Sequence, residues 1–194
     1  MWQEFKPTLY FLLRFFGTYI ILSLAYGLYI KHYDEQSPAL LDPFTRIIIN
    51  QVGKISSSLG YKSETIQNDH LNYPKSGYAQ TFDSLLLNDK RAIAVEEGCN
   101  GLNVMIMFVA FIFAFGGWKS RNSLWFLPLG LIFIHFSNLL RLFLLAWLNV
   151  DHDGRMFHFF HKYGFTAVSY ASVFLLWFVW VRNYAKSPKV DVIK

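Results

Sequence analysis

Four long apolar stretches constrain this chain more than any other feature of its sequence. Each has close to the about 20 mostly apolar residues that a helix needs to cross the hydrocarbon core of a bilayer. Charged residues make up only 16% of the 194 positions, against about 25% in typical globular chains. A soluble core of this size cannot bury so much apolar surface, so we expect lipid to cover much of it. The expected transmembrane helices are residues 8–30, 99–117, 123–148 and 162–182.

The net charge of +5 does not indicate a nucleic-acid partner. The lysines and arginines are scattered through loops, membrane edges and the C-terminal tail, with no basic stripe. Beside membrane spans a positive excess is a topology signal, because short positive loops stay in the cytoplasm. It predicts a cytoplasmic 118–122 loop and cytoplasmic termini, with residues 31–98 and 149–161 outside. We therefore expect a multi-pass protein of the inner (cytoplasmic) membrane that has the lipid bilayer as a partner.

An amphipathic helix is expected at residues 38–60, in the long connection after the first span. Asp42 followed by Pro43 is a start signal, and Gly60 is a stop signal. We expect this helix to lie flat on the outer membrane interface. An ordinary helix packed against the rest of the protein is the alternative. The apolar positions of residues 38–60 recur at intervals of three and four, as on one face of a helix: Leu41, Phe44, Ile48, Val52, Ile55 and Leu59.

Residues 61–98 are expected to form a polar extracytoplasmic segment. Leu85–Leu87 and Arg91–Val95 flank Asn88-Asp89-Lys90, which is the pattern of a β-hairpin. The predicted fold class is thus an all-α membrane protein that forms a single domain over residues 1–194. It has about four transmembrane helices, an interfacial amphipathic helix and a small extracytoplasmic β-hairpin region.

Three chemically distinctive side chains are predicted to meet at the outer membrane face. Cys99, the only cysteine, is expected to begin the second span at its outer end, and His161 precedes the fourth span. Arg141 lies seven residues before the outer end of the third span, so it is about 10 Å deep at 1.5 Å per residue. Asn138 lies one turn earlier on the same face. Charged residues inside spans usually face the bundle interior and mark function.

Each of these residues also has a simpler interpretation. Cys99 has a packing role or a palmitoylation role as alternatives, although a helix N-terminus lowers the pKa of a thiol and favours the reactive thiolate. Arg141 has the alternative of extending to the headgroups. His158 and His161 are three residues apart, a spacing that also suits a metal ion. The neighbouring Asp151, His152 and Asp153 would add further metal ligands.

Acyl transfer is the chemistry that uses a thiol, an imidazole and a guanidinium together. A thiolate attacks a peptide carbonyl, a histidine serves as general base and then as acid, and a cation stabilises the oxyanion. This division of roles requires proximity in space and no particular spacing in the sequence. No cofactor is needed, and we expect none.

Three motifs resemble those of the exosortase/archaeosortase family: Glu97-Gly98-Cys99-Asn100-Gly101-Leu102, Asn138-x-x-Arg141 and His161-Lys162-Tyr163. The resemblance covers roughly residues 40–182 and is closest to the short XrtF-type exosortase-like proteins of Bacteroidetes. It implies a membrane-embedded cysteine protease or transpeptidase that cleaves C-terminal sorting signals of exported proteins.

The resemblance also implies the roles of individual residues. Cys99 would be the nucleophile, Arg141 the transition-state stabiliser and His161 the acid and base, with His158 as the alternative base. Glu97, Asn100 and Asn138 would support them. Many family members have serine where this chain has Asn100, which leaves the immediate surroundings of the nucleophile open. Full-length exosortases have about twice as many spans, so this chain resembles a reduced core.

Two other functions compete with this one. The first is a non-catalytic membrane assembly subunit, for which Cys99 would be replaceable. The second is a metal-binding or haem-binding membrane protein that uses His152, His158 and His161.

The predicted topology is testable through the single cysteine. A membrane-impermeant maleimide should label Cys99 in intact spheroplasts, because the outer end of the second span faces away from the cytoplasm. Gel shift or mass spectrometry measures the labelling. Labelling that occurs only in inverted vesicles would contradict this orientation.

Overall fold

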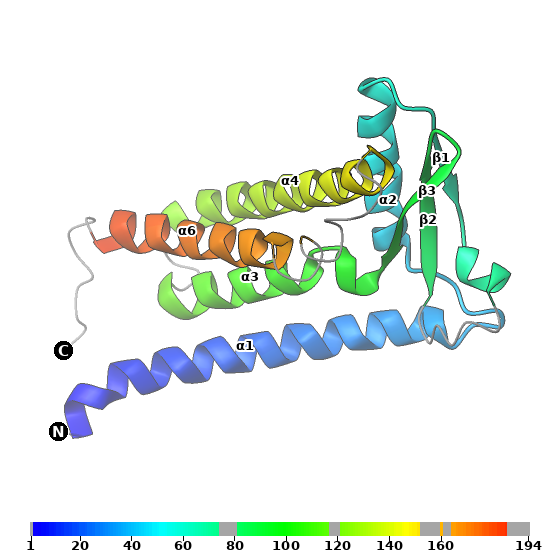
Figure 1. Ribbon diagram of the computed structural model, residues 1–194. Helices are drawn as coiled ribbons and strands as arrows, with labels where there is room; N and C mark the ends of the chain where they lie inside the picture. Colours follow the sequence, from blue (N-terminus) through cyan, green and yellow to red (C-terminus); the bar gives the residue numbers. More distant parts are fainter. Residues whose placement is uncertain (1, 74–80, 117–120, 152–159, 161–163, 186–194) are drawn as a thin grey trace.

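The computed structural model describes residues 2–73, 81–116, 121–151, 160 and 164–185. Long helices lie side by side, and a short helix and a small sheet cover one end of them (Figure 1). The first residues of α1 and the last residues of α6 are both at the opposite end. The order is α1 (Trp2–Asp34), α2 (Pro43–Ser58), β1 (Ser63–Ile66), η1 (Asp69–Asn72), β2 (Phe82–Leu87), β3 (Lys90–Glu96), η2 (Glu97–Cys99), α3 (Leu102–Gly116), α4 (Arg121–Asp151) and α6 (Phe165–Ala185).

The four long helices correspond to the four expected spans. Two of them contain segments that are long and apolar enough to cross a membrane, Phe5–Asp34 in α1 and Leu124–Asp151 in α4. The apolar segments of α3 and α6 are shorter, Leu102–Phe115 and Ala167–Asn183. The protein is therefore mostly helical with apolar helices of membrane type, and the count of four spans stays a prediction. Many large apolar side chains are exposed on α1, α4 and α6, as expected of surfaces that face lipid; they include Leu24, Leu28, Phe136, Leu140, Phe174 and Phe178.

Helix α2 begins and ends where its sequence signals predict. The Asp42 side chain accepts a hydrogen bond from the Thr45 backbone N–H at 3.0 Å, which caps the helix. Gly60 follows the helix with a φ of +94°, a conformation that costs glycine least. The backbone N–H of Tyr61 then donates to the Ser56 carbonyl at 3.1 Å, so the last carbonyls of the helix find partners.

The expectation that the apolar face of α2 contacts the membrane is wrong, whereas the position of α2 at the membrane interface stays a prediction. That face points into the protein, where Ile48, Ile49 and Val52 are fully buried with strands β2 and β3 and helix α4. The alternative of a packed helix describes α2 better. The reason is that the following segment supplies an apolar sheet, which hydrophobic periodicity within α2 does not reveal.

The predicted β-hairpin is present as β2 and β3. The loop residues Asn88 and Asp89 have φ values of +51° and +64°, as a two-residue hairpin turn of type I′ requires. Strand β1, which the sequence analysis missed, pairs antiparallel with β2 and completes a three-stranded sheet of order β1-β2-β3. The C-terminal end of α4 covers the edge of β3, where Asn149 Nδ2 donates to the Ala92 carbonyl at 2.7 Å.

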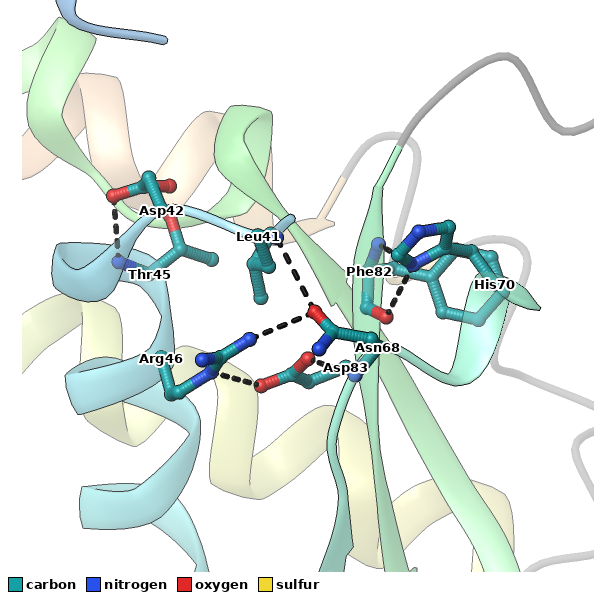
Figure 2. A network of polar contacts seen from close by, with 8 residues as sticks. All are labelled: Leu41, Asp42, Thr45, Arg46, Asn68, His70, Phe82 and Asp83. Atoms are coloured by element: carbon teal, nitrogen blue, oxygen red, sulfur yellow. Dashed lines mark hydrogen bonds and ion pairs between the residues drawn. The ribbon is translucent and has the colours of Figure 1, made fainter. Parts of the chain in front are cut away.

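A buried ion pair joins α2 to the sheet. Asp83 of β2 is fully buried and accepts from Arg46 Nε of α2 at 3.1 Å (Figure 2). Its second oxygen accepts the Asn68 backbone N–H at 2.6 Å, and the Asn68 side-chain oxygen accepts from an Arg46 terminal nitrogen at 2.8 Å. Both carboxylate oxygens therefore have partners, as a buried charge requires.

The long helices pack closely where α3 crosses α4. Phe108 of α3 is fully buried in a cluster with Ile112, Ile134, Val173 and Trp180. Gly130 of α4 faces its ring, and a Cβ built at Gly130 would lie 2.2 Å from Phe108 Cζ. The absence of a side chain at Gly130 thus allows the two helices their close approach, a common use of small residues in membrane helices.

Replacement of Gly130 by alanine should destabilise the protein, because the added methyl group overlaps a buried ring. We expect a loss of about 1–3 kcal/mol, the usual cost of overpacking. Thermal unfolding of the detergent-solubilised protein measures it. Gly17→Ala in α1 is the matched control, because no atom lies within 4 Å of a Cβ at that position. Equal melting temperatures for the two variants would contradict the close contact.

Candidate active site

Cys99 lies at the last position of η2, before α3 begins at Leu102. We call residues 97–100 the Cys99 turn. The sequence pattern predicts Cys99 in the first turn of the helix, and the difference has a physical reason. Gly101 has a φ of +79°, which a continuous right-handed helix does not allow. The thiol therefore lies in the loop that leads into α3.

Asn100 holds the Cys99 turn from three directions. It is 1% exposed, and its side-chain Nδ2 donates to the hydroxyl oxygens of Tyr26 at 2.8 Å and Thr45 at 2.9 Å. Its Oδ1 accepts from the Leu102 backbone N–H at 2.9 Å, which caps the start of α3. One buried amide thus links the turn to α1, α2 and α3 with all its hydrogen-bonding groups in use.

Sequence reasoning named Asn100 as a supporting residue but missed Tyr26 and Thr45. Tyr26 lies in an apolar span that is rich in aromatic residues, and Thr45 lies in the first turn of α2. The only available signal was that each is a polar group on an otherwise apolar surface. That signal does not identify the partner.

Helix α4 brings Asn138 and Arg141 to the Cys99 turn. Asn138 is 4% exposed, and its Nδ2 donates to the Cys99 carbonyl oxygen at 3.1 Å. Arg141 follows one turn later, with a buried Nε that makes no hydrogen bond within the described part of the chain. Its guanidinium is close enough for its charge to act on the thiol. The structure thus brings together Cys99, Asn138 and Arg141.

Opposing influences act on the Cys99 thiol. Burial raises its pKa above the ordinary value, because a buried thiolate loses its hydration. The Arg141 cation lowers the same pKa, and the carboxylates of Glu96 and Glu97 raise it. The net direction is upward. The sequence-based expectation that the helix N-terminus would favour the thiolate is therefore outweighed by burial in this state.

Glu97 lies beside the thiol in an acidic environment. Burial raises the pKa of its carboxyl group, and the charges of Asp34, Asp42 and Glu96 raise it further. One oxygen, Oε2, is buried and has no hydrogen-bond partner in the described residues. The side chain borders an open groove between α1 and the Cys99 turn, which Lys31 and Asp34 also line.

The predicted histidines His152, His158 and His161 lie outside the described residues. Their neighbour Asp153 lies outside them as well. Phe160, directly before His161 in the chain, packs against the same hydrophobic cluster as Cys99. Among the described residues, no group of three or more His, Cys, Asp or Glu side chains is arranged to hold a metal ion.

Fold and site define a helical membrane protein with a partly buried thiol whose pKa is lowered by the charge of an arginine on a neighbouring helix. The model of the transmembrane exosortase family (Exosortase_EpsH) matches residues 44–178, which is more than half of the chain, and the protein belongs to this family. It thus falls among the membrane-embedded sorting transpeptidases in general. Comparisons with curated proteins and with solved structures give no match. Helix α1 precedes the matched range.

The opposing charges around Cys99 predict shifts of opposite sign in its reactivity. Arg141→Gln removes the cation that lowers the pKa of the thiol, so the midpoint of Cys99 alkylation should move to higher pH. Glu96→Gln removes an anion that raises this pKa, so the midpoint should move to lower pH. Below the midpoint, one pH unit corresponds to an about tenfold change in the thiolate fraction.

Iodoacetamide labelling across a pH series, followed by mass spectrometry, measures both midpoints. Wild type is the reference, and the label reports one residue because the chain contains a single cysteine. Shifts of the same sign in the two variants would contradict this electrostatic account.

Proposed function

We propose that the protein is a cysteine transpeptidase or protease of exosortase type that cleaves C-terminal sorting signals of exported proteins. Cys99 is the nucleophile, Arg141 stabilises the oxyanion that forms in the transition state, and His161 transfers protons. The active site faces the extracytoplasmic side of the inner membrane, and both termini are cytoplasmic. We further propose that, within the exosortase family, the protein is of the XrtF type found in Bacteroidetes.

The single observation that carries the proposal is that α4, which holds the Cys99 carbonyl oxygen through Asn138, carries the Arg141 cation one turn later, within electrostatic reach of the thiol. A cation inside a membrane helix is costly and needs a reason. Its Nε donor is buried without an acceptor in the described residues, so it is available to an oxyanion. The same charge lowers the pKa of the thiol against the effect of burial.

The reaction divides into two acyl transfers. His161 takes the proton of the Cys99 thiol, and the resulting thiolate attacks the carbonyl carbon of the scissile peptide bond. The carbonyl oxygen becomes an oxyanion that the Arg141 cation stabilises. Collapse of this intermediate breaks the C–N bond, and the leaving amine takes the proton from the imidazolium of His161. Water or an amine then gives a proton to His161 as it attacks the thioester, and His161 returns this proton to the released Cys99 thiolate.

Asn138 and Asn100 have supporting roles in this scheme. Asn138 holds the Cys99 carbonyl oxygen from α4, the helix that also carries Arg141. Asn100 holds the other side of the turn. The nucleophile is thereby fixed relative to the cation, and such fixed geometry is a main source of catalytic rate.

Arg141→Lys should lower substrate processing by about 10²–10³-fold, the usual effect of losing one oxyanion donor. Lysine deprotonates more readily than arginine in a buried site and lacks its planar fork of donors. The measurement is loss of a C-terminal tag from an exported reporter that ends in a short motif, an apolar span and a basic tail.

Cys99→Ala serves as the inactive reference, and immunoblotting of membranes confirms equal abundance of all variants. Near-normal processing by Arg141→Lys would reduce Arg141 to a generic charge. Normal processing by Cys99→Ala would favour the non-catalytic assembly subunit instead.

A further inference from the structure

We propose that Tyr26 of α1 is a positioning residue for the Cys99 turn and acts through its hydroxyl group. The inference deepens the proposed function and rests on it in one respect, namely that the turn carries the nucleophile. Tyr26 belongs to a part of the chain that precedes the range matched by the family model, residues 44–178.

The Tyr26 hydroxyl bridges the two ends of the Cys99 turn. It accepts a hydrogen bond from Asn100 Nδ2 at 2.8 Å and donates to the Glu97 carbonyl oxygen at 3.4 Å. Glu97 lies two residues before Cys99, and Asn100 follows it directly. A single oxygen atom of α1 therefore contacts both sides of the nucleophile, and the turn cannot open without breaking one of these contacts.

Two other residues also hold the Cys99 turn, and the contacts of Tyr26 differ from theirs. Thr45 of α2 holds the second N–H of the Asn100 amide, and Asn138 of α4 holds the Cys99 carbonyl. Of these three supports, only Tyr26 reaches the Glu97 side. Loss of its hydroxyl leaves the Asn100 amide with a buried N–H that lacks a partner, and such a group is costly.

Helix α1 offers its own control one turn further along. The Tyr29 hydroxyl donates at 3.4 Å to Oδ1 of Asp42, a residue outside the Cys99 turn. Tyr26→Phe and Tyr29→Phe remove the same atom from the same helix, and each breaks a contact with another element. A general loosening of α1 would affect both variants, whereas positioning of the nucleophile involves Tyr26 alone.

The test is the rate of iodoacetamide labelling of Cys99 in the full-length, detergent-solubilised protein, measured across a pH series. This readout needs no substrate, so it is independent of whether the proposed reaction is correct. At high pH, where the thiol is ionised, Tyr26→Phe should raise the labelling rate about five- to tenfold, the effect expected from losing one buried hydrogen bond. The reason is that the partly buried thiol becomes accessible when the turn opens.

Tyr29→Phe should stay within about twofold of wild type. Asn100→Ser removes the same contact from the other side, together with the contact to Thr45, and provides a second variant if Tyr26→Phe does not accumulate. The double variant should be no more reactive than the more reactive single variant, because the two residues act as one unit. In a reporter assay, Tyr26→Phe should lower kcat and leave KM unchanged, although the thiol is more exposed.

Wild-type labelling rates in both Tyr26→Phe and Asn100→Ser would overturn the inference. Equal increases in Tyr26→Phe and Tyr29→Phe would also overturn it, because they would reflect α1 packing. A selective effect of Tyr26→Phe on labelling supports positioning, even if no variant, wild type included, processes the reporter. That last result would count against the proposed function alone.

Discussion

The partly buried ion pair between Arg46 and Asp83 is the interaction on which the rest of the site depends. It fixes α2 against the sheet, and Asn68 occupies the remaining groups of the pair. The position of α2 in turn sets the position of Thr45, one residue before Arg46, whose hydroxyl holds Asn100. The fully buried Asp83 carboxylate needs these partners, because a buried charge without a partner is costly.

Burial of the Cys99 turn has two opposing effects on the thiol. Burial excludes water, which protects a thioester from hydrolysis, but it also disfavours the thiolate. Arg141 offsets part of this cost because it keeps its charge in almost any environment. The amides of Asn100 and Asn138 are neutral, so they fix the backbone of the turn without adding to the negative charge of Glu96 and Glu97.

Much of the fold followed from local patterns in the sequence. The ends of α2 were predictable because Asp42 and Gly60 cap and terminate a helix through contacts with residues close to them in the sequence. The hairpin was predictable because Asn88 and Asp89 tolerate positive φ. Strand β1 was missed because residues 63–66 form a short strand that is polar in part. The packed position of α2 was only the alternative, because it depends on the sheet. The placement of His161 remains a prediction, since it lies outside the described residues.

The sequence by itself determined the membrane class and the family. These follow from the length and order of apolar segments and from short motifs, which are properties of neighbouring residues. Tertiary structure decided which polar groups meet, such as Tyr26 with Asn100, 74 positions apart, and Arg46 with Asp83, 37 positions apart. Such pairs depend on how each helix is rotated about its axis and packed against its neighbours, and hydropathy does not encode that rotation.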